Sequence, residues 1–561
     1  MLARSIATVA SPSKTKMKIL WIDLNSSYAH SSLALPALHA QMAADDAIEW
    51  AVVSATINEP PGTIADAIYR HRPDILAATV WLFNHEALMH VCSRVKALLP
   101  QVCLILGGPE FLGDNESFLR SHPLVSCVFR GEGEEEFPRW LARYRQQESW
   151  GEVKGLCYID HEGRYRDNGT ARVADFSSLM PPETSRFFNW EKPFVQLETT
   201  RGCFNTCAFC VSGGEKPVRS LPVEAIRQRL LAIHSHGIRD VRLLDRTFNY
   251  NPRRARELLE LFTSFPDMRF HLEIHPALLT NELKALLRQM PKGLLHLEAG
   301  IQSLRQEVLV QSHRAGRLEE ALEGLRFLCS LDNMETHADL IAGLPLYSLK
   351  ELVEDIHTLA TYQAGEIQLE SLKLLPGTEM RRRAEEWGIT HSSLPPYEVL
   401  QTREISSEEL QTARRLSRLL DAFYNTPAWQ SLTRSLMAHD QGFLMAFLKH
   451  LTDDNLIDQP MSLEKRGLLL YDYCRMYHTD FLTAASTAWI EAGMSLKKRP
   501  AERVRTRHLQ PPEHWRVLQG EYKGSLRLCF LPTGETETSG YWYGYESEAQ
   551  VPRPVFKAVT E

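Results

Sequence analysis

The sequence predicts an α/β protein with three parts: an N-terminal Rossmann-like parallel-sheet domain, a central partial (β/α)6 TIM-type barrel and a C-terminal mixed α+β domain. Two series of short apolar runs alternate with helical stretches, which is the pattern of βαβ units around a parallel sheet. The alternation is lost in the last part of the chain. A length of 561 residues accommodates about three or four domains.

The composition excludes several classes of protein. Hydrophobic residues make up 44% of the chain and charged residues 24%, which is typical of folded domains. The net charge of −7 lacks the basic excess of a nucleic-acid-binding protein, so a nucleic-acid partner is not expected. The chain has no apolar run long enough to span a membrane, and the short run Ile6–Ala10 is not a good signal peptide. We therefore expect a cytoplasmic protein with no membrane partner.

The first alternating series occupies residues 17–145 and follows an extension, residues 1–16, that is expected to be disordered. Strands are expected at 18–23, 51–55, 75–81, 102–106 and 125–130, and helices at 31–43, 64–70 and 86–99. Parallel sheets bind ligands outside the carboxyl ends of their strands. Residues just after these strands are therefore candidate ligand contacts: Asn25, Trp81, Asn84, Gly107, Gly108, Gly131, Glu132 and Gly133.

The second series occupies residues 193–385, after a connector at 146–192 that contains a hairpin-like segment at 155–166. Strands are expected at 194–199, 241–244, 270–274, 294–299, 337–342 and 366–373, separated by helices at 223–234, 252–262, 279–289, 317–328 and 349–360. Six strands joined by helices suit an incomplete barrel better than a doubly wound sheet, although periodicity alone does not separate the two. A parallel barrel keeps its working residues at the carboxyl ends of its strands.

The last part of the chain, residues 386–561, is predicted to be helical at first and rich in β structure near its end. Helices are expected at 406–424 and 441–451, and Pro427 is expected to close off the first of them. We expect this domain to close the mouth of the barrel and to shape the substrate site.

Three of the ten cysteines lie within eight residues, directly after the first expected barrel strand: Cys203, Cys207 and Cys210. In a reducing compartment such a cluster indicates metal or redox chemistry. Three thiolates can hold a four-iron cluster and leave one iron open to a small molecule. A closed zinc site requires a fourth ligand, which His234 or His236 could supply, and zinc is therefore the alternative.

The Cys203-x3-Cys207-x2-Cys210 pattern resembles the motif of the radical S-adenosylmethionine (SAM) enzymes. The resemblance extends over residues 190–380 and includes Phe209, Glu298-Ala-Gly-Ile-Gln302-Ser303, Asp339-Leu-Ile-Ala-Gly343-Leu-Pro345 and Leu375-Pro-Gly-Thr378. It implies that the three cysteines hold a [4Fe–4S] cluster, that the open iron binds SAM and that Phe209 contacts the adenine. It also implies a low-potential electron donor, such as flavodoxin or ferredoxin, whose electron yields a 5′-deoxyadenosyl radical.

Polar residues at other strand ends are also expected to bind SAM. Family members place polar groups after the second barrel strand, where Asp245 could accept from the methionine amino group and Arg246 could pair with its carboxylate. The alternative is a structural Asp–Arg pair. Three further residues end inner strands, where a buried carboxylate requires partners: Glu273, Glu298 and Gln302. The segment Gly213-Gly214-Glu215 is expected to be a flexible loop.

The parallel domain ahead of the barrel resembles the cobalamin-binding domain of one large subfamily of these enzymes. The match rests on Gly107-Gly108-Pro109-Glu110 and Gly131-Glu132-Gly133-Glu134, in which glycines let the backbone approach a bulky ligand. The resemblance implies cobalamin as a further cofactor. A domain that keeps the fold and has lost the ligand is the alternative.

The DxHxxG motif, which supplies a histidine to the lower face of cobalt in some cobalamin domains, is absent from this sequence. His30, His85 and His90 lie outside such a pattern and are expected to be packing or surface residues. The residues expected to face the lower side of cobalt are those after the third strand: Trp81, Phe83 or Asn84.

Together these features predict a cobalamin-dependent radical SAM enzyme that methylates an unactivated carbon of a small molecule or peptide, by way of the 5′-deoxyadenosyl radical and methylcobalamin. One alternative is a rearrangement or cyclisation without methyl transfer, and another is a cofactor-binding sensor without turnover. A tRNA-modifying enzyme is a further alternative, for which the only hints are the basic runs at 253–256 and 381–383.

Overall fold

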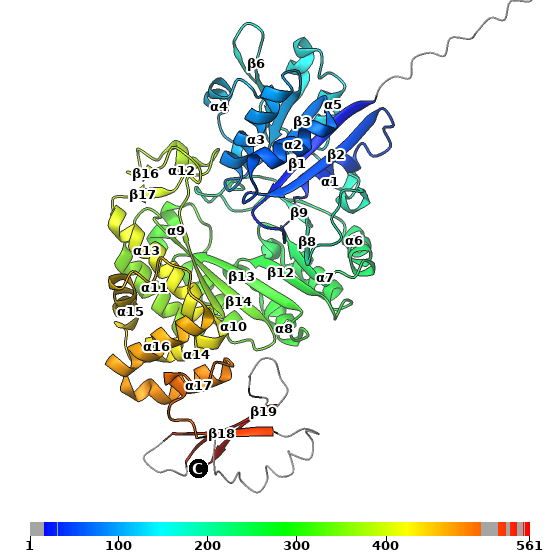
Figure 1. Cartoon of the computed structure of the whole chain (residues 1–561). Coiled ribbons are helices and arrows are strands. Elements are labelled where there is room, and N and C mark those ends of the chain that lie inside the picture. The colour runs from blue at the N-terminus through cyan, green and yellow to red at the C-terminus, as the bar shows by residue number, and fades with distance from the viewer. Residues whose placement is uncertain are drawn as a thin grey trace, which may run out of the picture. The chain divides into compact units, whose positions relative to one another are not determined.

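The computed structural model describes residues 16–30, 32–505, 526–533, 539–546, 554 and 556–560 (Figure 1). The extension that is expected to be disordered spans residues 1–16, and residues 1–15 lie outside the described part of the chain. The chain divides into two compact units. Unit 1 contains the residues up to Leu297 together with Glu307–Arg317 and Leu372–Arg403. Unit 2 contains Glu298–Gln306, Leu318–Ser371 and the residues from Glu404 onward.

Unit 1 begins with a seven-stranded sheet in the order β2-β1-β3-β4-β5-β6-β7 (Figure 1). The strands are β1 (Met17–Asn25), β2 (Ile48–Thr56), β3 (Ile75–Thr79), β4 (Cys103–Gly107), β5 (Cys127–Phe129), β6 (Leu156–Ile159) and β7 (Tyr165–Asp167). The first five are parallel to one another. β1 lies between β2 and β3, so the order in which successive strands are added to the sheet reverses at β1. The carboxyl ends of β1 and β3 are therefore the topological switch point.

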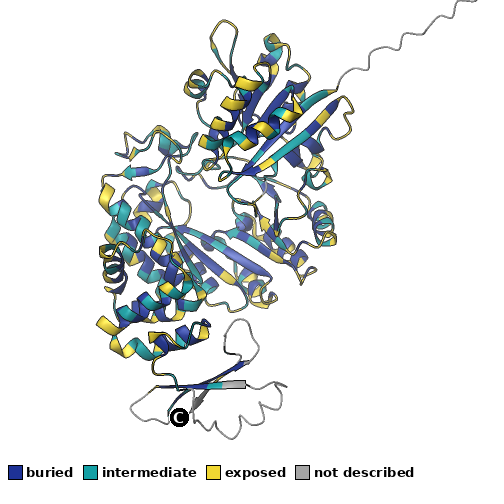
Figure 2. Ribbon diagram, viewed as in Figure 1, coloured by how far each residue is buried: buried dark blue, intermediate teal, exposed yellow. Residues whose placement is uncertain are grey.

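Helices cover both faces of this sheet. They are α1 (Ala34–Ala40), α2 (Pro61–His71), α3 (His85–Leu98), α4 (Glu116–Ser121) and α5 (Glu136–Leu141). Every residue of β3 is buried, as expected for a strand covered on both faces (Figure 2). Two separate apolar clusters result, one around Leu76 and Val91 and the other around Ile75 and Trp140. The predicted Rossmann-like domain is confirmed.

The hairpin expected within the connector is part of this sheet. β6 pairs antiparallel with β5, with Val128 opposite Cys157, and β7 pairs antiparallel with β6. Pairing in this way satisfies the backbone groups along the edge of β5, which would otherwise be exposed. Sequence periodicity identified the hairpin but carried no information about which strand it would join.

The second sheet has six strands in the order β15-β14-β13-β12-β11-β8, as expected for a partial barrel. The strands are β8 (Phe194–Leu197), β11 (Asp240–Leu243), β12 (Arg269–Ile274), β13 (Leu295–Gln302), β14 (Glu335–Ala342) and β15 (Glu366–Ser371). Helices follow the strands: α6 (Val223–Ser235), α7 (Pro252–Phe262), α8 (Asn281–Gln289), α9 (Gln306–Gln311), α10 (Leu318–Cys329) and α11 (Leu349–Thr361). The boundary between the units passes through β13. The segment after the barrel contains α12 (Glu379–Arg382), β16 (Thr390–His391) and β17 (Val399–Gln401).

The C-terminal part of unit 2 is largely helical. Its elements are α13 (Ser407–Leu419), α14 (Pro427–His439), α15 (Phe443–Asp453), α16 (Leu463–Tyr477), α17 (Leu482–Glu491), β18 (Leu526–Pro532), β19 (Gly540–Glu546) and β20 (Phe556–Thr560). Pro427 opens α14 rather than only ending the helix before it, because proline fits the first turn of a helix. Asn425 covers the edge of β15, where its side chain bonds both the N–H and the carbonyl of Ile367 at 2.9 and 3.0 Å. Within the described residues, no helix has the length and apolar character needed to cross a membrane.

Candidate active site

The three cysteines lie in one loop, residues 202–218, that follows the first barrel strand. β8 leads into β9 (Thr200–Arg201), and the chain returns through β10 (Arg219–Ser220). β9 and β10 pair antiparallel, with Arg201 opposite Arg219. The two ends of the cysteine loop are therefore joined in a short hairpin.

Main-chain hydrogen bonds fold the cysteine loop onto its own base. The N–H of Cys203 donates to the carbonyl of Glu215 at 3.1 Å. Gly213 permits this turn because a Cβ atom there would lie 2.4 Å from the carbonyl oxygen of Cys207. The segment 213–215, expected to be a flexible loop, has a defined task in the structure: it closes the cysteine loop.

A neighbouring segment of unit 1, residues 307–317, supports the loop from its other side. Asn205 accepts a hydrogen bond from the N–H of Ala315 at 2.9 Å, and Nη1 of Arg314 lies 3.7 Å from Sγ of Cys207. Burial raises the pKa of the Cys207 thiol, while the charge of Arg314 acts in the opposite direction. A guanidinium at this position stabilises the thiolate, which is the form that binds metal.

The arrangement fits an iron–sulfur cluster better than a zinc ion. Of the two candidate zinc ligands, His234 contacts Asp267 at 3.0 Å and His236 stacks on Trp190 with ring centres 3.7 Å apart. Over the described part of the chain, no three His, Cys, Asp or Glu side chains are placed to hold a single metal ion. In a four-iron cluster each thiolate binds a different iron, so the sulfur atoms need not converge on one point. The three cysteines would hold such a cluster.

Asp245 holds the strand end in front of the cysteine loop. Its side chain is 1% exposed and accepts hydrogen bonds from the N–H groups of Thr199 and Thr200 at 2.8 and 3.0 Å, and from the Thr199 hydroxyl. Burial raises the pKa of Asp245, and these bonds together with the charge of Arg254 oppose that shift. The geometry favours a structural role for Asp245 through Thr199 and Thr200 rather than through the expected pair with Arg246, which contacts Glu273 instead. The contact of Asp245 with the methionine amino group remains a prediction.

We expect Asp245→Asn to lower the free energy of unfolding by about 2–4 kcal/mol, because an amide NH2 would face buried donors that now bind a carboxylate. Urea denaturation of the cluster-free protein measures this change. The matched control is Asp267→Asn, because the Asp267 carboxylate is exposed and contacts His234 at the surface; no measurable change is expected there. Equal effects of the two substitutions would contradict the structural role of Asp245.

Arg246 follows β11 and is about half exposed, with Nη1 3.1 Å from a carboxylate oxygen of Glu273. A guanidinium has five N–H donors, so this ion pair leaves capacity for a carboxylate ligand. The expected pairing of Arg246 with the methionine carboxylate remains a prediction that this position supports.

The other residues expected to bind SAM have different surroundings. Phe209 is half-buried within the cysteine loop. Glu298 and Gln302 belong to unit 2, where both are half-buried on β13, and Gln302 ends this strand with a left-handed φ of 71°. Gly343 follows β14 with a φ of 89°, which glycine adopts readily. Their contacts with SAM remain predictions.

Sequence reasoning did not identify the residue that joins the loops after β13 and β14. Asp355 is 1% exposed and accepts hydrogen bonds from the Leu304 N–H at 2.8 Å and the Tyr347 hydroxyl at 2.6 Å. Both donors lie in loops at the carboxyl ends of strands in unit 2. Asp355 comes from α11, so only the fold brings it to these loops.

One cleft of about 580 Å³ opens at the carboxyl ends of the parallel strands of unit 1, and its size is that of a ligand pocket. On one side it is lined by the predicted strand-end residues Asn25, Trp81, Gly107, Gly108, Gly131, Glu132 and Gly133. On the other side it is lined by residues around the cysteine loop and the second barrel strand: Arg201, Gly202, Ser212, Glu215 and Arg246.

At two glycines the main chain itself, without a side chain, lines the cleft. Gly108 has a φ of 109°, and a Cβ atom there would lie 2.6 Å from the Val80 carbonyl oxygen. Gly131 has a φ of 96°, and a Cβ atom there would lie 2.2 Å from the Ala171 carbonyl oxygen. Trp21 also lines the cleft, and its buried Nε1–H has no hydrogen-bond partner among the described residues. An open backbone and a free donor fit a bulky ligand with acceptor groups, as cobalamin is.

The three residues expected beneath the cobalt have separate roles. Asn84 is 1% exposed: its amide donates to the carbonyls of Leu24 and Thr79 at 3.0 and 3.1 Å, and its oxygen accepts from the Trp81 N–H at 2.8 Å. Asn84 therefore fixes the loop, and its side chain does not line the cleft. Trp81 and Phe83 do line it, and their exposed rings are parallel within 8°.

The histidines expected to be packing or surface residues are placed in three ways. His30 lines the cleft, with its ring edge-on against Phe194 at 5.6 Å between ring centres. His85 lies 3.3 Å from a carboxylate oxygen of Glu110, and His90 is exposed. The exposure of His30 agrees with the expected packing or surface position, and its place after β1 is the signal in the sequence that indicates the cleft.

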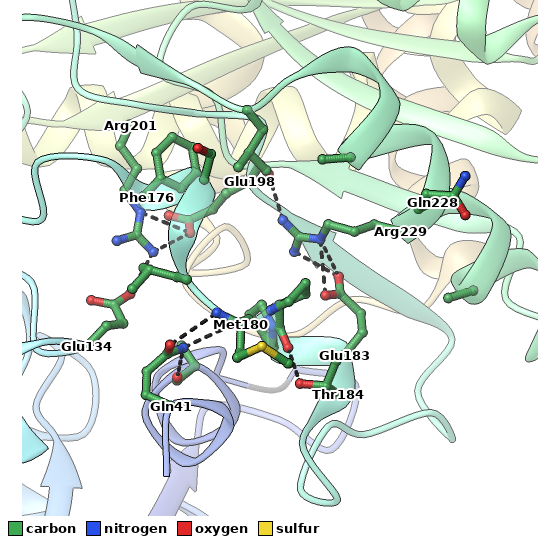
Figure 3. A pocket seen from close by; sticks show the side chains of 18 residues that line it. Gln41, Glu134, Phe176, Met180, Glu183, Thr184, Glu198, Arg201, Gln228 and Arg229 are labelled. Carbon is green, nitrogen blue, oxygen red and sulfur yellow. Dashed lines mark hydrogen bonds and ion pairs between the residues drawn. The ribbon is translucent and has the colours of Figure 1, made fainter. Parts of the chain in front are cut away.

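Five charged side chains, which we name the Arg201 network, join the N-terminal domain to the cysteine loop: Glu132, Glu134, Glu198, Arg201 and Arg219. Figure 3 shows Arg201 between Glu134 and Glu198, at 2.7 and 2.8 Å. A second pocket, of about 380 Å³, shares these three side chains with the cleft. Arg201 adjoins Gly202-Cys203 in the sequence, but nothing in the sequence indicated its partners.

The comparisons with known proteins cover all three parts of the chain. Residues 22–141 match the B12 binding domain family, residues 197–359 match the radical SAM superfamily, and residues 385–488 match a family of proteins of unknown function, DUF4080. The first two matches confirm the predicted cofactor set of cobalamin, a [4Fe–4S] cluster and SAM. The third match gives no function for the C-terminal domain.

Curated relatives are similar over part of the chain. An uncharacterized methyltransferase of Pyrococcus horikoshii is 27% identical over 35% of this chain and 44% of its own length. The cobalamin-dependent radical SAM methyltransferase TokK of Streptomyces tokunonensis is 23% identical over 59% of this chain and 51% of its own length. The chain thus spans about half the length of these relatives.

Solved structures share the fold at low identity. The cobalamin-dependent SAM radical enzyme OxsB, with aqua-cobalamin and SAM bound, superposes with a TM-score of 0.58 at 15% identity, over 85% of this chain and 79% of its own. The radical SAM methyltransferase TsrM of Kitasatospora setae superposes with a TM-score of 0.56 at 14% identity, over 68% of this chain and 78% of its own. The domain matches therefore show that the chain contains a B12-binding domain, then a radical SAM domain, then a region of the DUF4080 family.

Proposed function

We propose that this protein is a cobalamin-dependent methyltransferase that transfers a methyl group to an unactivated carbon of a small molecule or a peptide. The observation that carries the proposal is that a single cleft is lined both by the glycine loops of the B12-binding domain and by residues around the cysteine loop. Methyl transfer to a carbon radical requires both reacting groups to face one substrate atom, and a shared cleft provides that proximity. The methyltransferase names of the curated relatives support the same reaction class.

When bound, the cluster and SAM supply a radical that removes a hydrogen atom from carbon, and cobalamin supplies the methyl group. The protein's residues hold these groups and orient them. The three cysteines would hold the cluster, and Arg246 would pair with the methionine carboxylate. The backbone at Gly108 and Gly131 would lie against the corrin. The rings of Trp81 and Phe83 would cover one side of the cleft and exclude water from it.

The reduction that starts the reaction requires an external electron source. We propose a low-potential protein donor, such as flavodoxin or ferredoxin. A chemical reductant can replace this donor in the test below.

Product analysis after anaerobic reconstitution tests the proposal. The protein is loaded with iron, sulfide and hydroxocobalamin, reduced, and incubated with methyl-labelled SAM and a small-molecule and peptide extract. Methylation of carbon consumes two SAM molecules, of which one yields S-adenosylhomocysteine and the other yields 5′-deoxyadenosine and methionine. We therefore expect both nucleoside products, together with label in an extract component.

Other outcomes identify the alternatives. 5′-Deoxyadenosine without S-adenosylhomocysteine or label transfer would indicate a rearrangement or cyclisation. Neither product, from a protein with an intact cluster and bound cobalamin, would indicate a cofactor-binding sensor. Label in added tRNA rather than in the extract would indicate a tRNA-modifying enzyme.

A further inference from the structure

Two arginines face each other at the base of the cysteine loop. Arg201 and Arg219 are directly opposite in the antiparallel pair of β9 and β10. Like charges in opposed positions destabilise a strand pair. These side chains are only 13% and 10% exposed, so water and salt screen their repulsion less than at a surface. The hairpin that closes the cysteine loop therefore needs a negative charge close to both guanidinium groups.

Glu132 supplies that charge from the N-terminal domain. Its two carboxylate oxygens accept from Nη1 and Nη2 of Arg219 at 2.8 and 2.5 Å, and its Oε2 lies 3.7 Å from Nη1 of Arg201. The Glu132 side chain is 15% exposed. Burial alone would raise the pKa of Glu132, but the bond from Arg219 leads the contacts that hold it below its usual value. A fully charged carboxylate thus lies between the two arginines.

The loop that carries Glu132 also forms one side of the cleft. Residues 131–134 all line it. The position of Glu132 is fixed by its N–H, which donates to the Ala171 carbonyl at 3.0 Å, and by its carboxylate, which accepts from the Val173 N–H at 2.7 Å. Any ligand that packs against this loop therefore also restrains the counter-charge of the cysteine hairpin.

Two further carboxylates of the Arg201 network bind Arg201, and Glu215 of the cysteine loop also lies 3.8 Å from Nη2 of Arg219. Glu134, from the same cleft loop, and Glu198, from the end of the first barrel strand, both bind Nη2 of Arg201 (Figure 3). Arg201 is thus held from the N-terminal domain and from the barrel at once. The guanidinium also lies over the ring of Phe176, at 5.1 Å from the ring centre.

We propose that the Arg201 network couples cobalamin binding to assembly of the iron–sulfur cluster, with Glu132 as the positioning residue that transmits the coupling. The coupled element is the β9–β10 hairpin, which is closed when Glu132 bridges its two arginines. The cluster favours the closed hairpin because its ligands lie in the loop that the hairpin closes. Cobalamin would favour it because the corrin would pack against the loop that presents Glu132 and restrain it further in this position. Each cofactor therefore raises the affinity for the other, and by linkage the two effects are equal.

The proposal rests on the cofactors of the proposed function and does not depend on methyl transfer. The coupling is measured as the dissociation constant of hydroxocobalamin from cluster-free protein divided by that from cluster-loaded protein. Absorbance titrations under anaerobic conditions give both constants. Coupling between binding sites is typically about 5- to 150-fold, and we expect a ratio of about tenfold for the unmodified protein.

Glu132→Gln removes the charge while retaining the size of the side chain, and we expect its ratio to fall to about one. The matched control is Glu135→Gln, because Glu135 is an exposed acidic residue three positions away; its ratio is expected to match that of the unmodified protein. A ratio of one in the unmodified protein overturns the proposal. The proposal is also overturned if Glu132→Gln weakens hydroxocobalamin binding equally in cluster-free and cluster-loaded protein, because Glu132 would then act only on its own loop.

A second variant tests the charge argument and also guards against a folding defect. Arg219→Gln removes one of the opposed arginines, so the hairpin no longer needs its full counter-charge. We expect the double variant Glu132→Gln/Arg219→Gln to recover part of the coupling that Glu132→Gln loses, because the uncompensated repulsion is removed with the second arginine. A ratio that stays at one in the double variant overturns the charge argument. A protein that forms its cluster and binds no cobalamin in any variant contradicts the proposed function instead, which keeps the two failures distinct.

Discussion

Replacing Cys207 with alanine is expected to reduce the iron and sulfide bound after reconstitution at least about tenfold, as expected for loss of a metal ligand. The Cys207 side chain is 5% exposed and lies beside Arg314, whose guanidinium stabilises the thiolate that binds iron. Reductive cleavage of SAM should be lost together with the iron. Iron and sulfide analysis, the absorbance of the cluster and 5′-deoxyadenosine formation measure these effects.

The control for this substitution is Cys329→Ala. Cys329 is half-buried at the end of α10, outside the cysteine loop, and its replacement should leave the iron content unchanged. Cys203→Ala and Cys210→Ala should behave like Cys207→Ala. Unchanged iron and sulfide in the Cys207 variant, or a stoichiometric amount of zinc in the unmodified protein, would remove the basis of the cluster assignment.

The second large effect is expected for Gly108→Ala in the floor of the cleft. Gly108 has φ and ψ of 109° and −178°, a region that is almost restricted to glycine. A Cβ atom there would also overlap the Val80 carbonyl oxygen, at 2.6 Å. We expect the free energy of unfolding to fall by at least about 3 kcal/mol, and cobalamin affinity to be lost with the shape of the loop. Urea denaturation and cobalamin titration measure the two effects.

Gly169→Ala separates backbone strain from the steric overlap. Gly169 also has a positive φ, of 77°, but no atom lies within 4 Å of the position its Cβ would take. Strain alone should cost about 1–2 kcal/mol and leave cobalamin affinity unchanged. If Gly108→Ala behaves like Gly169→Ala in both measurements, the close approach of backbone at Gly108 does not shape the cleft.

Local patterns predicted most of the regular structure. Every expected strand of the two parallel series is present, because strands buried on both faces read as short apolar runs between helices. Three helices of the C-terminal domain were not anticipated: α14, α16 and α17. α17 is apolar on more than one side, and such a helix lacks the one-sided periodicity that identifies an amphipathic helix.

The candidate site likewise contains some residues that local patterns reveal and others whose role appears only in the fold. The cysteine motif is a local spacing, and the glycine loops are local turns after strands, so both could be recognised from the sequence. The sequence did not show that Asp245 and Asn84 bond the main chain, because a polar residue after a strand can serve either a ligand or the backbone. Their hydrogen bonds with Thr199 and Thr200 and with Leu24 and Thr79 exist only once the strand ends are brought together.

The sequence by itself determined the order of the domains, the three cysteines and the cofactor class, since each depends on residue types at short spacings. Only the tertiary structure decided which carboxylates meet which arginines. Glu132 and Arg219 are 87 positions apart, and no periodicity relates positions so distant in the chain. Their contact follows from the placement of the loop after β5 beside the base of the cysteine hairpin, because buried charges must find partners of opposite sign wherever the fold brings them.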